Sequence, residues 1–476
     1  MPEKTLCPHR WPLARRAPGS VRELNRLVDE GIIMKPFRGL VLRILALASL
    51  ISVLVGSAAV QPSTHAAGSV TLTFWESTNP QEQAFTKPAV AQWNKQHPDI
   101  FIKLQDIPAG NSTEEVYAAA IAAHKTPDIT NNLLPAVVPQ YSSEGGLYQM
   151  DKLPDYISYM TARMPAGTLT QFKSSDGHYY QVPWKANPVM FIYRTDLFKK
   201  AGITSFPRTY SQFLAALQAL KKKTNVNPIF PTIDTTWWQR FFDFYPFYLA
   251  QSGGTMLLNS QANSAIFQDH GAAQVMTFWR KIFAQQLAPK SSSTADKWAV
   301  NQEAMYMAGP WGPNGEIYQH KAGNIPWGVA PIPVPDSMAS SAPAYPYTYS
   351  DPKNITIFAS TKYPQQAWQF IKYYINAQND AKLLQTTWEF PYRAQLIANP
   401  VKYSSLFKQY PQLEQFAKQL PHTSGLDNTP KFQQVFDNVS QAWGSAVING
   451  SKSPQAAVKS AASAVDGVVS GGGNSP

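Results

Sequence analysis

The side chains that most often carry catalysis are spread thinly along this chain of 476 residues. No G-x-x-x-x-G-K-[ST], G-x-S-x-G or H-E-x-x-H motif occurs, so nucleotide, serine-hydrolase and zinc-hydrolase chemistry lack their local signatures. The histidines beyond the leader region are isolated, without an i, i+4 pair: His97, His124, His178, His270, His320 and His422. Catalysis by a general acid and a general base, each a carboxyl group, stays possible, because the two residues of such a pair can lie far apart in sequence. We predict no catalytic residue, no metal ligand and no cofactor.

The composition is poor in charge and rich in aromatic rings. Charged residues make up 15% and aromatic residues 12% of the chain, which includes 13 Trp, 22 Tyr and 24 Phe. A formal charge of +11 suggests nucleic acid, but the first 66 residues hold nine basic and four acidic residues, which leaves +6 for the rest. Those remaining basic residues are dispersed, with Lys221–Lys223 as the one run. We therefore expect no nucleic-acid partner.

Residues 1–66 have the features of an export leader. Basic residues precede the apolar run Ile44–Val55, and small residues follow it, as in a secretory signal. The run is too short to span a membrane. A start at Met34 gives a leader of ordinary length, so we hypothesise that translation begins there. Cys7 precedes the apolar run, so we predict an exported protein, periplasmic or on the extracellular face of the cytoplasmic membrane, and not a Cys-anchored lipoprotein.

The segment after the leader alternates between strand and helix patterns. Val70–Trp75 and Ile100–Leu104 are rich in strand-forming residues. Apolar residues recur at helical spacing from Phe85 to Trp93, with Pro88 expected in the first turn, and the Ala-rich stretch 114–124 favours a second helix. This β-α-β-α order predicts an α/β fold with a mainly parallel sheet.

The second half of the chain shows further elements. Val189–Tyr193 is predicted as a strand. Thr209 and Gln212 have the spacing of a capping box, which predicts the start of a helix. Amphipathic patterns predict helices at 367–375 and 454–465.

Six segments of the chain occur in an order that is more specific than any one of them. They are QWNKQHPDIFIK (92–103), TPDI (126–129), GLYQMDKLPDY (146–156), DGHYYQVPWKANPVMFIYRTDLFKKAG (176–202), NQEAMYMAGPW (301–311) and AWQFIKYY (367–374). Together they resemble the extracellular solute-binding proteins of bacterial ABC transporters, the family-1 sugar-binding group that includes maltose-binding protein. The chain departs from the family where a Gly-Gly pair is common, because Tyr349, Ser350 and Asp351 stand there.

The resemblance implies a two-lobed, periplasmic-binding-protein-like (type II) α/β fold with a ligand cleft between the lobes. The predicted parts are a leader at 1–66, one lobe at 70–186 plus 336–375, the other at 190–325 plus 380–466, and a flexible tail at 467–476. Connections between the lobes are expected near 186–189, 325–335 and 375–381. In open α/β sheets, ligands bind outside the carboxyl ends of the strands, which agrees with a cleft at this place.

The resemblance also implies a function. A monomer without enzymatic activity captures a mono- or oligosaccharide, closes by a hinge motion and delivers it to the permease subunits of an ABC importer that is driven by a separate ATPase. Two alternatives stay open. One is a secreted carbohydrate-active enzyme that uses Glu76 and a second carboxylate, and the other is a binding protein for a non-sugar ligand such as a polyamine or peptide.

Sugar binding needs aromatic rings for the flat C–H faces and polar groups for the hydroxyls. Residues at strand ends, in the expected connections and in the GPW motif meet this need. Each has a structural alternative, which is core packing for a Trp, a turn for an Asn and an ion pair for Arg393. Trp237 and Trp238 are adjacent, so at most one is expected to stack on the ligand. The predicted ligand-binding residues are Trp75, Glu76, Asn131, Asn132, Trp184, Asn187, Trp237, Trp238, Trp311, Asp351, Trp388 and Arg393.

Overall fold

The structure is a computed structural model that describes residues 69–471, except for 260, 262, 292–296, 299, 316–324 and 395–403. The predicted leader 1–66, with Met34 and Cys7, lies outside the described residues, as does the tail from 472. None of the helices in the described part is both long and apolar enough to cross a membrane.

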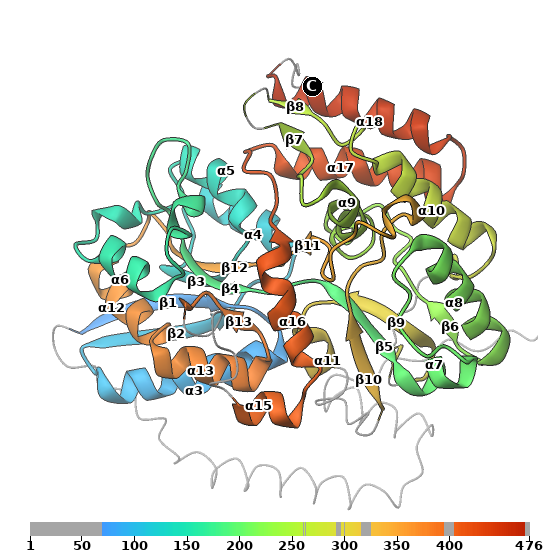
Figure 1. Cartoon of the computed structure of the whole chain (residues 1–476). Helices are drawn as coiled ribbons and strands as arrows, with labels where there is room; N and C mark the ends of the chain where they lie inside the picture. Colours follow the sequence, from blue (N-terminus) through green and yellow to red (C-terminus); the bar gives the residue numbers. More distant parts are fainter. Residues whose placement is uncertain are drawn as a thin grey trace, which may run out of the picture. The chain divides into compact units, whose positions relative to one another are not determined.

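The first sheet contains the strands that were predicted early in the chain (Figure 1). Its order is β13-β4-β12-β3-β1-β2. The bounds are β1 Val70–Glu76, β2 Ile100–Asp106, β3 Ile129–Leu133, β4 Val182–Ala186, β12 Lys353–Ile357 and β13 Phe390–Pro391. β1 runs parallel to β2 and to β3, with Phe74 opposite Leu104 and Ile129, whereas β12 is antiparallel to both β3 and β4. The strands expected at 70–75 and 100–104 are therefore confirmed.

Helices pack on both faces of this sheet. On one face, Phe74 contacts Phe370 and Tyr374 of α12, and Tyr374 contacts Phe85 of α3. On the other face, Tyr117 of α4 stacks on Trp75 at 6.3 Å. The helices of this half are α3 Pro80–Gln96, α4 Thr113–Ala122, α5 Val138–Ser143, α6 Tyr156–Arg163, α12 Pro364–Tyr374 and α13 Ala377–Thr387.

The start of α3 differs from the expectation. Asn79 caps the helix, because its side-chain oxygen accepts a hydrogen bond from the Gln81 N–H at 2.9 Å, and Pro80 occupies the first helical turn. Pro88 therefore lies inside the helix and not in its first turn. The capping signal precedes the apolar stripe by a full turn, which the spacing of the apolar residues did not reveal.

The second sheet has the order β10-β5-β9-β6 and lies to the right in Figure 1. β5 pairs antiparallel with β10 and β9, and β6 pairs parallel with β9. The strands are β5 Met190–Arg194, β6 Asn227–Ile229, β9 Glu303–Ala308 and β10 Trp327–Ala330. The helices of this half are α7 Thr195–Ala201, α8 Tyr210–Lys223, α9 Phe244–Ser252, α10 Ala272–Ala284, α15 Ser404–Gln409, α16 Leu413–Gln419, α17 Phe432–Trp443 and α18 Pro454–Val469.

The predicted cap of α8 is confirmed in part. Thr209 Oγ1 accepts a hydrogen bond from the Gln212 N–H at 3.5 Å. The return bond is displaced by one residue, because Gln212 Oε1 accepts from the N–H of Arg208 and not from that of Thr209. Burial of Phe213, Leu217 and Leu220 agrees with the expected apolar stripe.

The chain passes between the two halves at three places. The first passage joins β4 to β5 at Asn187–Val189, where it was expected. The second lies at Ser350–Pro352, later than 325–335, because β10 still belongs to the second sheet and β12 is the next strand of the first. β13 also belongs to the first sheet, so the third passage follows Pro391 and not 375–381. The lobe bounds themselves stay a prediction that this strand order refines.

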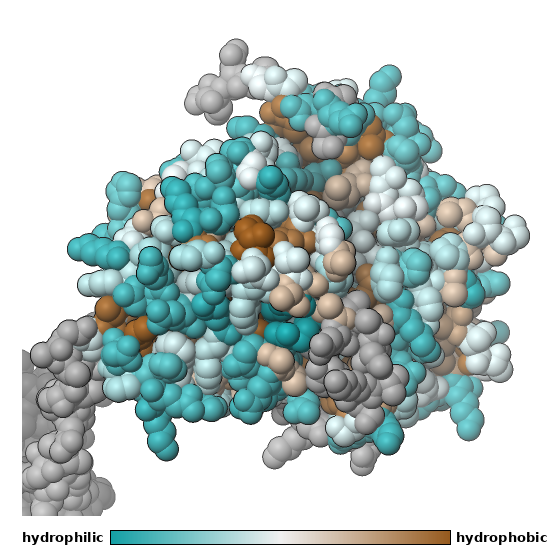
Figure 2. Space-filling model, turned by 60° about the vertical axis from the view of Figure 1, so that its left-hand side comes forward, coloured by the Kyte–Doolittle hydropathy of each residue, from teal (hydrophilic) through white to brown (hydrophobic). Residues whose placement is uncertain are grey.

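The surface of the described part is largely polar. The face in Figure 2 is mostly hydrophilic, with apolar side chains gathered in separate small patches. Among the described residues the large hydrophobic side chains classed as exposed are Ile157, Val300 and Tyr363. Aromatic side chains are instead concentrated in the cores, where Trp184, Trp279, Trp298, Trp388 and Trp443 are fully buried.

Candidate functional site

The carboxyl ends of three parallel strands meet at one edge of the first sheet. The loops after β1 and β2, together with Asn132 of β3, line a cavity of about 580 Å³ there, which we call the strand-end pocket. Its lining is Ser77–Gln81, Ile107–Thr113 and Asn132. Small polar side chains and loop backbone dominate this lining, and its position is the one where open α/β sheets bind ligands.

A second cavity borders the strand-end pocket, and Asn111, Ser112 and Thr113 line both. We call it the cleft pocket, and its volume is about 240 Å³. It is lined by Asn111, Ser112, Thr113, Glu114, Leu134, Trp237, Trp238, Phe241, Phe242, Asp351 and Lys353. The first five come from the half with the first sheet, the four aromatic residues from the other half, and the last two from the second passage and the start of β12.

Four aromatic side chains form one wall of the cleft pocket. They belong to the 3-10 helix η5, Trp237–Phe242, which directly precedes α9. Trp237 is 4% exposed and packs edge-on against Phe241 and against Phe432 of α17. Trp238 is half-buried and is the more exposed of the two indoles that line the pocket. Trp311 contacts one of these side chains, with its ring 6.2 Å from that of Phe242.

The opposite wall is the beginning of α4. Ser112 caps this helix, because its Oγ accepts a hydrogen bond from the Glu115 N–H at 3.1 Å. Thr113 Oγ1 accepts a hydrogen bond of 3.5 Å from the side-chain amide of Asn132. Hydroxyl, amide and carboxylate side chains therefore line the same cavity as the aromatic rings. Such a lining suits a ligand that combines apolar faces with hydroxyl groups.

A family model described as bacterial extracellular solute-binding protein matches residues 88–415. The chain belongs to this family. The family that the six sequence segments resemble is therefore confirmed, and so is the two-lobed α/β fold.

Several relatives of this solute-binding protein are known. A putative binding protein of Brucella abortus (strain 2308) is 24% identical over 304 residues, which are 62% of this chain and 69% of the relative. The diacetylchitobiose binding protein DasA of Streptomyces coelicolor is 20% identical, over 62% of this chain and 67% of the relative. The GacH receptor of Streptomyces glaucescens, described unliganded and in complex with acarbose, has a TM-score of 0.70 and 19% identity over 84% of this chain and 99% of that chain. At this identity the structural match shows the fold.

Four of the predicted site residues of this solute-binding protein line the two pockets. Trp237, Trp238 and Asp351 line the cleft pocket, and Asn132 lines the strand-end pocket. Trp311 contacts Phe242 of the aromatic wall.

Three predicted residues near the ends of β1 and β3 make contacts outside the two pockets. Trp75 packs against Tyr117 on the sheet face that α4 covers. Glu76 points to the other face and is 1% exposed, and burial raises its pKa to about 7, although Lys87 opposes this. Asn131 is fully buried and donates from its side-chain amide to the Tyr374 hydroxyl at 3.1 Å. Their part in ligand binding stays a prediction.

Four further predicted residues form structural contacts around the passages. Trp184 is fully buried against Phe85 and Tyr374. Trp388 stacks on Trp327 with ring centroids 6.0 Å apart. Arg393 forms an ion pair with Asp380, with Nε 2.7 Å from Oδ2, which is the alternative to ligand binding that the sequence left open. Asn187 donates from Nδ2 to Glu389 Oε1 at 2.8 Å.

Sequence reasoning missed several lining residues. Lys353, Phe241, Phe242 and the turn 111–114 carry no signal of their own, because lysines and phenylalanines are abundant and the turn precedes an ordinary helix. Ser112 and Glu115 have the spacing of a capping box, which could have placed the start of α4 at the end of β2.

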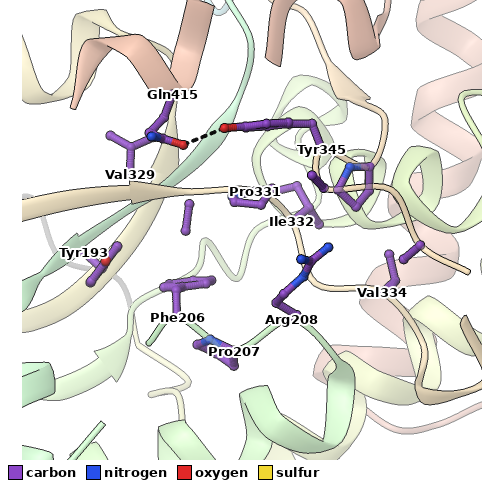
Figure 3. Close-up of a pocket in the computed structure, with 14 residues that line it drawn as sticks. Tyr193, Phe206, Pro207, Arg208, Val329, Pro331, Ile332, Val334, Tyr345 and Gln415 are labelled. Atoms are coloured by element: carbon purple, nitrogen blue, oxygen red, sulfur yellow. Dashed lines mark hydrogen bonds between the residues drawn. The ribbon is translucent and has the colours of Figure 1, made fainter. Parts of the chain in front are cut away.

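Another cavity lies away from the sheet ends, beside the edge strand β10. Its volume is about 260 Å³, and Figure 3 shows Phe206, Pro207 and Arg208 on one side of it and Tyr345 with Gln415 on the opposite side. Its polar groups are already engaged, since Arg208 donates to the Pro343 carbonyl and the Tyr345 hydroxyl donates to Gln415 Oε1. It contains none of the predicted site residues, and neither does a cavity of about 400 Å³ that shares Leu134 with the cleft pocket. We therefore take the strand-end pocket and the cleft pocket as the candidate site.

Proposed function

We propose that this solute-binding protein captures a carbohydrate outside the cytoplasm and delivers it, unchanged, to an ABC importer. The observation that carries the proposal is the cleft pocket, which aromatic rings line together with hydroxyl, amide and carboxylate side chains. Sugar rings stack their C–H faces on aromatic rings, and their hydroxyls both donate and accept hydrogen bonds. The relatives described with diacetylchitobiose and with acarbose support a carbohydrate ligand.

The proposed mechanism is hinge closure. The aromatic wall and the α4 wall come from different halves of the molecule and are joined by the passages at 187–189 and 350–352. A ligand that contacts both walls stabilises the closed arrangement over the open one. The closed monomer then docks on the permease subunits of the importer, which a separate ATPase drives, in the periplasm or at the extracellular face of the cytoplasmic membrane.

A thermal-shift screen combined with tryptophan fluorescence tests the ligand class. The probes are maltose, N,N'-diacetylchitobiose, acarbose and their monosaccharides, with spermidine and a tripeptide as comparisons. A sugar at 100 times its Kd is expected to add about 2.7 kcal/mol to the free energy of unfolding. The emission of Trp238 is expected to change in the same titration, because its ring lines the pocket.

Two outcomes contradict the proposal. A thermal shift with spermidine or the tripeptide, and with none of the sugars, rejects the carbohydrate ligand. Chromatography of the sugars after long incubation detects any hydrolysis, and shortened products establish an enzyme in place of a capture protein.

A further inference from the structure

The second passage between the sheets also forms the floor of the cleft pocket. Tyr349 belongs to β11, Thr348–Tyr349, which pairs with β14, Thr423–Ser424, and Lys353 begins β12 of the first sheet. The segment is held in place by backbone bonds, in which Val189 N–H donates to the Tyr349 carbonyl and Asp351 N–H donates to the Asn187 carbonyl. The floor is therefore fixed to the first passage as well.

Side chains alternate along this segment. Ser350 and Pro352 line a different cavity, of about 400 Å³, whereas Asp351 and Lys353 line the cleft pocket. This is the alternation that extended backbone produces. It presents a carboxylate and an ammonium side by side to the same space, opposite the aromatic wall.

The ammonium of Lys353 has little to bind in the protein itself. Its nearest acidic atom is Asp351 Oδ1 at 3.7 Å, beyond hydrogen-bonding distance, and no hydrogen bond links it to another residue in the described part of the chain. The Lys353 side chain is 22% exposed and lines the cleft pocket. Burial lowers the pKa of Lys353, but the carboxylates of Asp351 and Glu114 outweigh this and raise the pKa above its ordinary value, so the side chain stays charged.

The carboxylate beside it also keeps a free acceptor. Asp351 Oδ1 accepts a hydrogen bond from the Tyr349 hydroxyl at 3.2 Å, and Oδ2 has no donor among the residues that the structure describes. One group of the pair can therefore only donate and the other only accept. Two adjacent hydroxyls of a sugar ring match such a pair, because one can accept from the ammonium while its neighbour donates to the carboxylate.

We propose that Lys353 is a specificity-determining residue of the candidate site, which reads a pair of adjacent ligand hydroxyls together with Asp351 while the sugar ring stacks on Trp238. The inference rests on the proposed carbohydrate function and names the feature that the site selects, a vicinal diol. It also gives the floor, which is part of a hinge passage, a direct contact with the ligand.

The test compares Lys353→Met with the unchanged protein. The probe is whichever of maltose, N,N'-diacetylchitobiose and acarbose binds, together with its monodeoxy derivatives, and affinities are measured by calorimetry. The unchanged protein is expected to bind one deoxy derivative about 10- to 100-fold more weakly, the range for a hydrogen bond to a charged group. Lys353→Met is expected to lose a similar factor for the intact sugar and to bind that deoxy derivative no more weakly than the intact sugar.

Controls separate the possible failures. Lys362→Met removes an equal charge from an exposed site and is expected to bind as the unchanged protein does. If Lys353→Met binds the intact sugar normally, or still discriminates against the deoxy derivative, the role of Lys353 is refuted while the carbohydrate function stands. The deoxy series on the unchanged protein needs no variant, and equal affinity for every derivative refutes the diol. If no sugar binds the unchanged protein, the proposed function fails and this inference with it.

Discussion

Trp237 and Trp238 are neighbours in sequence, but their surroundings differ. Trp237 is wedged between Phe241 and Phe432, with ring centroids 5.6 and 5.2 Å away, and is 4% exposed. Trp238 is half-buried beside it and lines the same pocket. One indole therefore packs η5 against α17, and the other is the one that we expect to stack on a ligand.

Alanine at each of the two positions is expected to separate these roles. Trp238→Ala removes a stacking surface of about 1.5–3 kcal/mol, so the Kd for the sugar found in the screen should rise about 10- to 100-fold. The free energy of unfolding without sugar should change little. Trp237→Ala should instead destabilise the protein by about 3–5 kcal/mol, because it leaves a cavity in the core. Calorimetric titration and urea denaturation measure the two quantities, and the opposite pattern in the two variants refutes this assignment.

Residue type alone does not decide which aromatic side chains line the pockets. Trp184 and Trp388 were predicted as ligand-binding residues because a Trp near a connection is a plausible sugar platform. In the structure both are almost completely buried, and their rings fill the space beside the passages. A large aromatic ring can pack in a core or stack on a ligand, and only the residues around it decide between the two roles. For Trp184 and Trp388 these residues come from segments that are distant in sequence, such as α3 and β10.

At the scale of elements, α4 is the part that shapes the polar wall. The helix begins at Thr113 because Ser112 satisfies the Glu115 N–H, and Glu114 and Glu115 lie at the positive end of the helix dipole. The turn that leads into it, from Asn111, lines both pockets. A change in this cap therefore affects the stability of the helix and the geometry of the site together.

Ser112→Ala tests this coupling, and Ser453→Ala is a matched control. Ser453 caps α18 in the same way, with its side chain accepting from the Ala456 N–H at 3.1 Å, but it lies outside the pockets. Both substitutions are expected to lower the free energy of unfolding by about 1 kcal/mol. Ser112→Ala alone should weaken sugar binding, by several-fold. Equal affinities of the two variants in calorimetry show that the cap does not shape the site.

The elements themselves followed from local patterns wherever apolar periodicity was strong. β1, β2, α8 and α12 lie where the sequence predicts them. The passages at 350–352 and after Pro391 were missed, because strands of two residues such as β11 and β13 carry no periodicity. Their places are set by pairing with partners far away, β14 for β11 and β4 for β13.

For the whole molecule, a buried ion cluster joins segments that are far apart in sequence. Lys185 of β4 lies with its Nζ 2.8 Å from both Glu82 Oε1 of α3 and Glu389 Oε1, and it is fully buried. Asn187, in the first passage, donates to the same Glu389 and accepts from the Phe390 N–H. Burial raises the pKa of Glu389, and Lys185 opposes this increase. The cluster thus holds the beginning of the first passage against the first sheet.

Lys185→Met is expected to lower the free energy of unfolding by about 3–5 kcal/mol, because it leaves two buried carboxyl groups without their counterion. Lys372→Met is the control, since its ion pair with Asp155 has side chains that are 31% and 45% exposed and should contribute about 1 kcal/mol or less. Urea denaturation measures both. Adding Glu82→Gln and Glu389→Gln to Lys185→Met should restore part of the loss, because no unpaired charge is then buried. A loss in Lys185→Met no larger than in Lys372→Met, or a triple variant less stable than Lys185→Met, contradicts a stabilising role of this ion cluster at the first passage.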